Sequence, residues 1–474
     1  MKAARVITLE KVKLAFLICV FGTGSWVAVN GLWVELPVLV GQSPQQWSLP
    51  SYLTVVIQLA NIGPLVYLLL QKYAICKSKV VTETRTIYLI LFVGALASIL
   101  LAFTWKETSV INNKPYSTSL IVLSLFMATV DCTSSVTFLP FMANFPSKFM
   151  TIYYVGEGMS GLVPSVVAMI QGVGKQSYTC EERAVLKNMS LNYTTKKGGA
   201  HAESTTGLKN GTMFNSTEIV PSYFHTEPRF SATVFFVVIT AIMVCSLTAF
   251  ILLIRIKNKN VKLECTHDAQ EMDQYNSTKC LQNFYNDTNS GPKSSAPSTI
   301  DQLNNRKYYF LLSLNGVING ISNGVLPALQ SYACLPYGNN IYHLTLTLSA
   351  VANPVCCFLY FLVSVQSSVA IFIGVCVYLA SASYTIGIAA TSPCPLWRDS
   401  SAGGVVVLLV TVFGVGLVSY LKTAISTVIR SHGYKGLLLC GVSVQVGSLV
   451  GALIIFPLVN VYGYFKQSQA CQVC

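Results

Sequence analysis

The sequence predicts an all-α polytopic membrane protein, and two observations lead to this class. Of the 474 residues, 53% are hydrophobic and only 10% are charged, with a mean hydropathy of +0.56. Soluble domains carry about 25% charged residues, so this chain has too few to cover several soluble domains. In addition, eleven stretches reach the roughly 20 apolar residues that a helix needs to cross a bilayer. The composition excludes a secreted disulfide scaffold, a nucleic-acid-binding protein and an ordinary cytosolic enzyme.

The expected spans follow one another with two large polar interruptions. They are 14–39, 49–71, 86–105, 118–143, 147–171, 230–254, 308–331, 341–363, 367–391, 403–423 and 435–462. The predicted organisation is an N-terminal segment 1–13, spans one to five in 14–171, a loop 172–229, span six in 230–254, a loop 255–307, spans seven to eleven in 308–462 and a tail 463–474.

Basic residues predict the orientation of these spans. The formal net charge is +13, and most Lys and Arg residues, Lys422 and Arg430 among them, fall on the side of the N-terminus. Because short cytoplasmic loops are enriched in Lys and Arg, we expect a cytoplasmic N-terminus and an extracellular tail. One alternative is that Lys11, Lys13 and the apolar run 14–21 form a cleaved signal peptide. Apolar residues that continue through Val40 favour a membrane span.

The two polar loops differ in kind. The loop 172–229 holds four sequons in close succession, at Asn188, Asn192, Asn210 and Asn215, which is typical of a glycosylated extracellular loop. The loop 255–307 holds two more, so sequons alone do not orient the chain. Cysteines that face outside would lie in an oxidising compartment, and a bridge from Cys394 to the tail is one option, but spacing does not fix the pairing.

The two halves of the chain resemble each other weakly. Asn30-Gly31 followed by Pro37 in span 1 matches Asn323-Gly324 followed by Pro327 in span 7. Span 2 and span 8 share Tyr, Thr and Ala-Asn at similar positions. Because spans 1 and 7 run in the same direction, this is a parallel repeat of six and five spans, as in carriers of the major facilitator type. Two bundles with a path between them indicate a transporter.

Only three of the 18 acidic residues fall inside spans: Glu35, Asp131 and Glu157. A charge at mid-bilayer costs at least about 2.5 kcal/mol on insertion scales, so each should face the interior, be neutralised or be paired. Substrate contact or proton relay is the functional interpretation. A structural hydrogen bond between helices, or a side chain that reaches the interface, is the alternative.

Further polar and aromatic residues in the spans are candidates for the path. Trp26, Asn30 and Trp33 are spaced to share one helical face, which suits a planar heteroaromatic ligand, or else forms a packing stripe with an interfacial Trp. In span 7, Asn-Gly recurs at 315–316, 319–320 and 323–324, where the glycines permit close helix approach and the amides hydrogen-bond. The residues expected along the path here are Asn319, Asn323 and Gln330. Further candidates, which are more often interhelix contacts, are Thr133, Ser134, Ser135 and Asn353.

The sequence gives no sign of a cofactor or of an enzyme. The segment 156–161 matches the pattern GxGxxG, but it lies in an apolar span and follows no strand. No metal-ligand cluster and no nucleophile beside a base stands out. We therefore expect no cofactor, no bound metal and no nucleic-acid partner.

Several long motifs resemble one family. The strings NGLWVELP at 30–37, LPSYLTVVIQLANIGP at 49–64, VDCTSSVTFLPFM at 130–142, VGEGMSGLVP at 155–164, SPCPL at 392–396 and FPLVN at 456–460 are similar to the vertebrate plasma-membrane riboflavin transporters, solute carrier family 52. The resemblance runs from span 1 to span 11 and weakens in the two long loops, as surface segments do.

The resemblance implies sodium-independent uptake of riboflavin (vitamin B2) by an eleven-span carrier similar in fold to equilibrative nucleoside transporters. It also implies a disulfide between Cys394 and Cys471, a preference of some members for acidic pH, and use of some members as receptors by retroviral envelope proteins. The alternatives are a carrier of another planar heteroaromatic solute such as a nucleoside, a receptor without transport, and a lipid-modifying enzyme. The sequence shows no cluster of catalytic residues that would support the enzyme.

Overall fold

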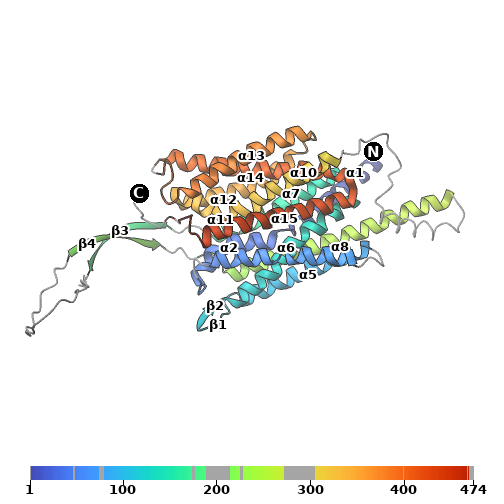
Figure 1. Cartoon of the computed structure of the whole chain (residues 1–474). Coiled ribbons are helices and arrows are strands. Elements are labelled where there is room, and N and C mark those ends of the chain that lie inside the picture. Colours follow the sequence, from blue (N-terminus) through green and yellow to red (C-terminus); the bar gives the residue numbers. More distant parts are fainter. Residues whose placement is uncertain are drawn as a thin grey trace, which may run out of the picture.

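The helices lie side by side in one elongated molecule (Figure 1). The helices of residues 2–271 form the first bundle and those of residues 305–460 the second. The computed structural model describes residues 2–45, 49–73, 79–172, 177–187, 214–224, 228–271, 305–398, 400–466 and 468. The N-terminus lies at one end of the molecule, and two β-hairpins lie at the other (Figure 1). We call these the N-terminal end and the hairpin end.

The helices of the first half are α1 (Lys2–Thr23), α2 (Val27–Gln42), α3 (Leu49–Leu59), α4 (Ile62–Tyr73), α5 (Lys79–Thr104), α6 (Thr118–Phe141), the 3₁₀ turn η2 (Met142–Asn144), α7 (Lys148–Gln171) and α8 (Ala232–Glu271). Those of the second half are α10 (Asn305–Asn319), the π-helical η3 (Gly320–Val325), α11 (Leu326–Cys334), η4 (Leu335–Tyr337), α12 (Asn339–Leu359), α13 (Ser368–Ala390), α14 (Ser401–Ile429), η5 (Arg430–His432) and α15 (Gly433–Asn460).

Helices occupy all eleven expected spans, and the all-α polytopic membrane class is confirmed. By length and hydropathy, seven segments of the described residues qualify as spans, or eight when the bent pair α1 and α2 counts as one. That count takes 401–460, which contains both α14 and α15, as a single segment. The number eleven and the side of each loop stay predictions.

Two sheets of two strands each lie at the hairpin end. β1 (Ser109–Ile111) pairs with β2 (Lys114–Tyr116), and β3 (Ser177–Lys187) pairs with β4 (Phe214–Phe224), both antiparallel. The second hairpin lies in the loop 172–229, for which the sequence predicted no strand. Another difference is α8, which continues to Glu271, well past the expected end of the span at 254 (Figure 1).

Span 1 is broken, although its hydropathy predicted one continuous helix. α1 and α2 meet at an angle of 53°, across the small residues 22–25, whose glycines disfavour helix. The break exposes backbone carbonyls, and serines on neighbouring helices satisfy them. Ser246 of α8 donates to the Phe21 carbonyl at 3.1 Å, and Ser134 of α6 donates to the Ser25 carbonyl at 3.1 Å.

Spans 2 and 7 are also interrupted. Span 2 breaks between α3 and α4, where Pro64 lacks the N–H that would bond the Ala60 carbonyl, and the Asn61 side chain bonds the Gln58 carbonyl at 3.2 Å. Span 7 passes through the π-helical η3 just before Pro327. π-helical turns occur frequently at functional sites.

The hydrophobic core is divided as the six-plus-five repeat predicts. One large cluster is built almost wholly from α1 to α8, and two smaller clusters come from α10 to α15. Within the second half, the expected glycine ridge packs directly on α15. A Cβ at Gly320 would lie 2.9 Å from the Gly447 carbonyl oxygen, and one at Gly324 would lie 2.7 Å from the Ser448 carbonyl oxygen. The predicted close helix approach is therefore confirmed.

Candidate functional site

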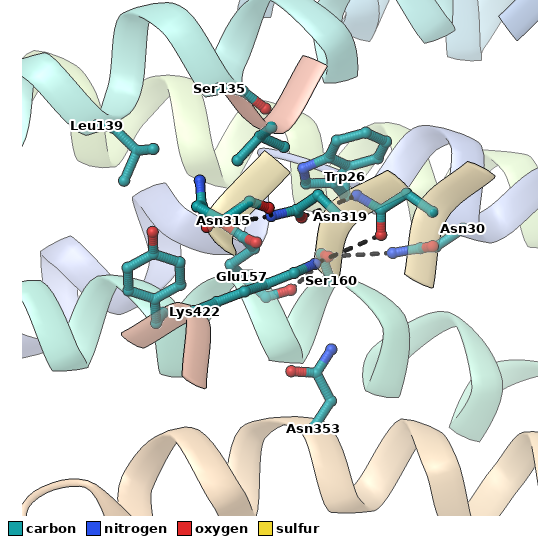
Figure 2. A pocket seen from close by; sticks show the side chains of 13 residues that line it. Trp26, Asn30, Ser135, Leu139, Glu157, Ser160, Asn315, Asn319, Asn353 and Lys422 are labelled. Atoms are coloured by element: carbon teal, nitrogen blue, oxygen red, sulfur yellow. Dashed lines mark hydrogen bonds between the residues drawn. The ribbon is translucent and has the colours of Figure 1, made fainter. Parts of the chain in front are cut away.

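A polar cavity lies where the two bundles meet (Figure 2). It holds about 660 Å³ of empty space, open solvent at its mouth included. The first bundle lines it with Trp26, Asn30, Ser135, Leu139, Tyr154, Glu157 and Ser160, and the second with Asn315, Asn319, Asn323, Asn353, Lys422 and Val444. We call this the central cavity.

The asparagines of span 7 form one connected row along the central cavity. The Asn319 amide donates to the Asn315 carbonyl at 2.8 Å, and the Asn323 amide donates to Oδ1 of Asn319 at 3.3 Å. The row is held by α15, because Asn315 donates to the Ser443 hydroxyl at 2.7 Å and Asn323 to the Ser448 hydroxyl at 3.3 Å. The amides are thereby fixed in place with part of their hydrogen-bonding capacity facing the cavity.

Lys422 and Glu157 bring opposite charges to the central cavity from opposite bundles. The Lys422 ammonium donates to Oδ1 of Asn323 at 3.4 Å, and Figure 2 shows its side chain reaching toward Glu157 and Ser160. The two charges attract each other. The sequence placed Lys422 at the end of its span among the cytoplasmic basic residues. That placement is wrong, because α14 continues two turns further, to Ile429.

Asn30 and Trp26 stand at the break of span 1. The Asn30 amide donates to the Ser160 hydroxyl at 3.2 Å, which joins α2 to α7. Trp26 lies at the start of α2, with its indole at the cavity. Seven expected residues therefore line the central cavity: Trp26, Asn30, Ser135, Glu157, Asn319, Asn323 and Asn353.

The other expected residues do not line the central cavity. Trp33 packs into a small apolar cluster with Val29, Ala60 and Ala128. It points toward α3 and α6, so the predicted shared face with Trp26 and Asn30 is wrong for this residue. Gln330 lies on α11 at a second cavity within the second bundle.

The acid Asp131 and its neighbours support the helix break. Oδ2 of Asp131 accepts a hydrogen bond from the Val29 N–H at 2.8 Å. The Ser134 hydroxyl donates its hydrogen bond to the Ser25 carbonyl. Thr133 is buried beside Gly63 of α4. These three residues thus occupy the packed contact between α6 and spans 1 and 2.

Glu35 is fully buried near the hairpin end. Its Oε1 accepts a hydrogen bond from the Gln171 amide at 3.0 Å, and the same amide donates to the Phe230 carbonyl at 3.0 Å. Glu35 thus connects α2 to the end of α7 and the start of span 6, away from the central cavity.

Sequence reasoning missed six cavity residues, and some of them carried a signal. Tyr154 and Ser160 are one helical turn from Glu157 on either side, and Asn315 is one turn before Asn319, so each shares a face with an expected residue. Lys422 is followed by the uncharged run 423–429, which places it inside a longer span. Leu139 and Val444 carried no signal that separates them from ordinary packing residues.

The expected modifications lie mostly outside the described residues. The residues that the structure does not describe include Asn188, Asn192, Asn210 and Cys471. Of Asn215, which lies in β4, only the backbone is described. Cys394 is disulfide-bonded.

Comparison with known proteins assigns the family. The sequence profile described as solute carrier family 52, riboflavin transporter, matches residues 10–467. The chain belongs to this family. It is 39% identical to the riboflavin transporter member 3-A of Danio rerio, with 96% of this chain and 97% of the relative covered. It is 37% identical to member 3 of Bos taurus, over 96% and 98% of the two chains, and 33% identical to member 2 of Homo sapiens, over 96% of each.

Solved structures agree on the fold of this riboflavin-transporter family member. The major facilitator proton:xylose symporter XylE aligns with a TM-score of 0.54 at 12% identity, covering 96% of this chain and 89% of that chain. The human organic anion transporter MFSD10 aligns with a TM-score of 0.50 at 8% identity, covering 95% and 94%. The fold is therefore that of major facilitator carriers, as the parallel repeat predicted.

Proposed function

We propose that this protein carries riboflavin across the membrane by alternating access, with the central cavity as the substrate site. The observation that carries the proposal is a cavity at the contact of two bundles that is lined by five asparagine side chains and one charge of each sign. Carriers bind substrate at the repeat interface near the midplane. The family and the names of its members supply riboflavin as the substrate.

The chemistry of the cavity suits this vitamin. Riboflavin presents a flat isoalloxazine ring with a uracil-like edge and a ribityl chain of hydroxyls. Amide side chains both donate and accept hydrogen bonds, which matches the alternating donors and acceptors of such an edge. Trp26 offers an aromatic face for stacking. The ribityl hydroxyls would find partners in Ser160 and in the charged ends of Glu157 and Lys422.

We assign the substrate-contacting role to Trp26, Asn30, Glu157, Asn319, Asn323 and Asn353, together with Ser160 and Lys422. Of the remaining expected residues, Asp131, Thr133 and Ser134 support the break of span 1, Trp33 packs α2 against its neighbours, Glu35 ties α2 to α7, and Gln330 belongs to the second cavity. Each assignment follows the contacts that the side chain makes.

Hydrogen bonds between the bundles support closure at the N-terminal end. Arg430, in the turn between α14 and α15, donates to the Met142 carbonyl at 2.6 Å, to the Ala143 carbonyl at 3.3 Å and to the Phe145 carbonyl. Tyr434 accepts from Gln71 of α4 at 2.8 Å. In the proposed cycle these contacts break when the path opens at this end.

We further propose that the N-terminal end faces the cytoplasm, that the C-terminal tail is extracellular and that the membrane is the plasma membrane. The distribution of basic residues supports the orientation, and the resemblance supports the membrane. Sodium-independent transport favoured by acidic pH, glycans in the loop 172–229, a Cys394–Cys471 bridge and recognition by a retroviral envelope protein belong to the same proposal.

Uptake of labelled riboflavin into cells that express the chain tests the function. We expect saturable uptake that excess unlabelled riboflavin suppresses and that a nucleoside such as uridine leaves unchanged. Suppression by uridine instead would indicate the nucleoside carrier. Riboflavin binding by surface-expressed protein with no net uptake would indicate a receptor and contradict the proposal.

A further inference from the structure

Tyr154 lies in the wall of the central cavity on the side of the N-terminal end. Its side chain is 5% exposed and lines the cavity. The residues just before α7 contact Arg430 at the N-terminal end, so Tyr154 is nearer to that end than Glu157, by about 4.5 Å along the helix. Tyr153 packs against the Tyr154 ring with a centroid distance of 5.4 Å and an interplanar angle of 75°. The ring is therefore held in place at this wall.

The Tyr154 hydroxyl crosses from the first bundle to the second. It is hydrogen-bonded to the Ser426 hydroxyl of α14 at 2.5 Å, and both residues are buried. The Ser426 hydroxyl is in turn 3.4 Å from the Cys440 thiol of α15, and the Asn315 amide donates to the Cys440 carbonyl at 3.2 Å. The contact between the bundles is thus connected to the first asparagine of the row that lines the cavity.

Ser426 differs from other hydroxyl-bearing residues in the same part of α14. Ser419, Thr423 and Thr427 each donate to the carbonyl four residues earlier in their own helix, at 2.7–2.9 Å. A serine at position 426 can turn in the same way, but its hydroxyl bonds Tyr154. When the bundles separate, Ser426 can return to its own helix, and the Tyr154 hydroxyl can meet the water of the cavity. The bond can therefore break and re-form without leaving a buried group unsatisfied.

Hydrogen bonds between the bundles lie at two depths on this side of the cavity. At the N-terminal end itself, Arg430 bonds the carbonyls that follow α6, and Tyr434 bonds Gln71. The bond between Tyr154 and Ser426 lies deeper, directly at the cavity, and Ser426 is one turn of chain before Arg430. Release of a substrate toward the N-terminal end requires the bundles to separate below the cavity, which breaks the contacts at both depths.

We propose that Tyr154 is the inner gate of the substrate site. Its ring contacts the bound substrate, and its hydroxyl, through Ser426, holds the two bundles together while the path is closed at the N-terminal end. The inference rests on the proposed function and deepens it, because it divides the two tasks between two parts of one side chain. The ring contributes to substrate affinity, and the hydroxyl sets how often the path opens.

The test measures modification of Cys440 by a membrane-impermeant maleimide, with peptide mapping, in intact cells and in cells whose membrane has been opened. Tyr154→Phe is the decisive variant, because it removes the bond between the bundles and leaves Ser426 beside Cys440. We expect modification to rise roughly fivefold from one side of the membrane only, equivalent to about 1 kcal/mol for one hydrogen bond. The KM for riboflavin uptake should not change.

Further variants separate the gate from a general loosening of the fold. Tyr154→Phe combined with Ser426→Ala should give the same modification as Tyr154→Phe alone, because both remove the same bond. Ser419→Ala, which removes a hydroxyl bonded within α14, is the matched control and should resemble wild type. Tyr154→Ala, which also lacks the ring, should raise the KM roughly fivefold, equivalent to about 1 kcal/mol for an aromatic contact.

Three results would overturn the proposal: unchanged Cys440 modification in Tyr154→Phe, a rise that is equal from both sides of the membrane, or a raised KM in Tyr154→Phe. The last result would show that the hydroxyl contacts the substrate. Modification of Cys440 needs no riboflavin, so failure of the gate is distinguishable from failure of the proposed function, which absence of riboflavin uptake by the wild-type protein would show.

Discussion

The Asp131 carboxylate of α6 caps the broken start of α2 by accepting a hydrogen bond from the Val29 N–H at 2.8 Å. The first N–H groups of a helix have no partner within the helix, and the N-cap residue Trp26 gives α2 no side-chain cap. A membrane acid that sequence reasoning favoured for substrate contact therefore holds the geometry of the break that places Trp26 and Asn30.

Asp131→Ala should destabilise the protein more than it affects substrate recognition. Loss of a cap costs about 0.5–2 kcal/mol, so we expect a lower Tm in detergent and reduced surface expression. Asp131→Asn retains an acceptor oxygen and should recover most of the Tm. An unchanged Tm with a raised KM in Asp131→Ala would show direct substrate contact instead.

How far the sequence predicted the fold can be seen at span 1. Hydropathy located the span, because roughly 20 apolar residues suffice to identify it. The break at residues 22–25 could not be predicted, since it depends on Ser134 and Ser246, which reach the exposed carbonyls from α6 and α8. Partners distant in sequence determine such a break, and local propensity only permits it.

The candidate site was predicted in part for a similar reason. Polar groups are scarce in the spans, and for this reason the sequence indicated Glu157 and the asparagines of span 7, which do line the central cavity. The same criterion also indicated Asp131 and Glu35, because composition cannot distinguish an acid that faces a cavity from one that bonds a neighbouring helix. Lys422 was misplaced because the hydropathy signal of its span ended too early.

The charges of Glu157 and Lys422 should act together in transport. Glu157→Gln or Lys422→Met leaves the other charge without its counterpart in a poorly solvated site. We expect each single variant to lose roughly tenfold or more in kcat/KM for riboflavin uptake, equivalent to about 1.4 kcal/mol. The double variant should reach the cell surface at least as well as either single one. Fully additive losses in surface expression would show that the two charges are independent.

Gly447 should tolerate no side chain. A Cβ there would overlap the Gly316 carbonyl of α10, and overpacking of this kind costs about 1–3 kcal/mol. We expect Gly447→Ala to lower the Tm in detergent. Gly387→Ala on α13 is the control, because nothing lies within 4 Å of its Cβ position and alanine favours helix over glycine. Equal Tm values for the two variants would contradict the packing described for span 7 and α15.

Arg430 should stabilise the state that is closed at the N-terminal end. Its guanidinium donates hydrogen bonds to several carbonyls at once, which the single ammonium group of a lysine does poorly. We expect Arg430→Lys to increase the reaction of Cys440 with a thiol reagent, because Cys440 is fully buried behind this closure. Peptide mapping measures the modified fraction. Lys435→Met, an exposed residue at the same end, should leave the modification of Cys440 unchanged, and equal reactivity in both variants would contradict a gating role for Arg430.

The most direct test of the central claim is riboflavin counterflow in proteoliposomes that contain the purified protein. Vesicles preloaded with unlabelled riboflavin should accumulate labelled riboflavin above equilibrium, and Asn323→Leu should abolish this accumulation while Gly387→Ala preserves it. Absence of accumulation with wild-type protein that retains its Tm would contradict riboflavin transport. Full accumulation with Asn323→Leu would contradict the central cavity as its site.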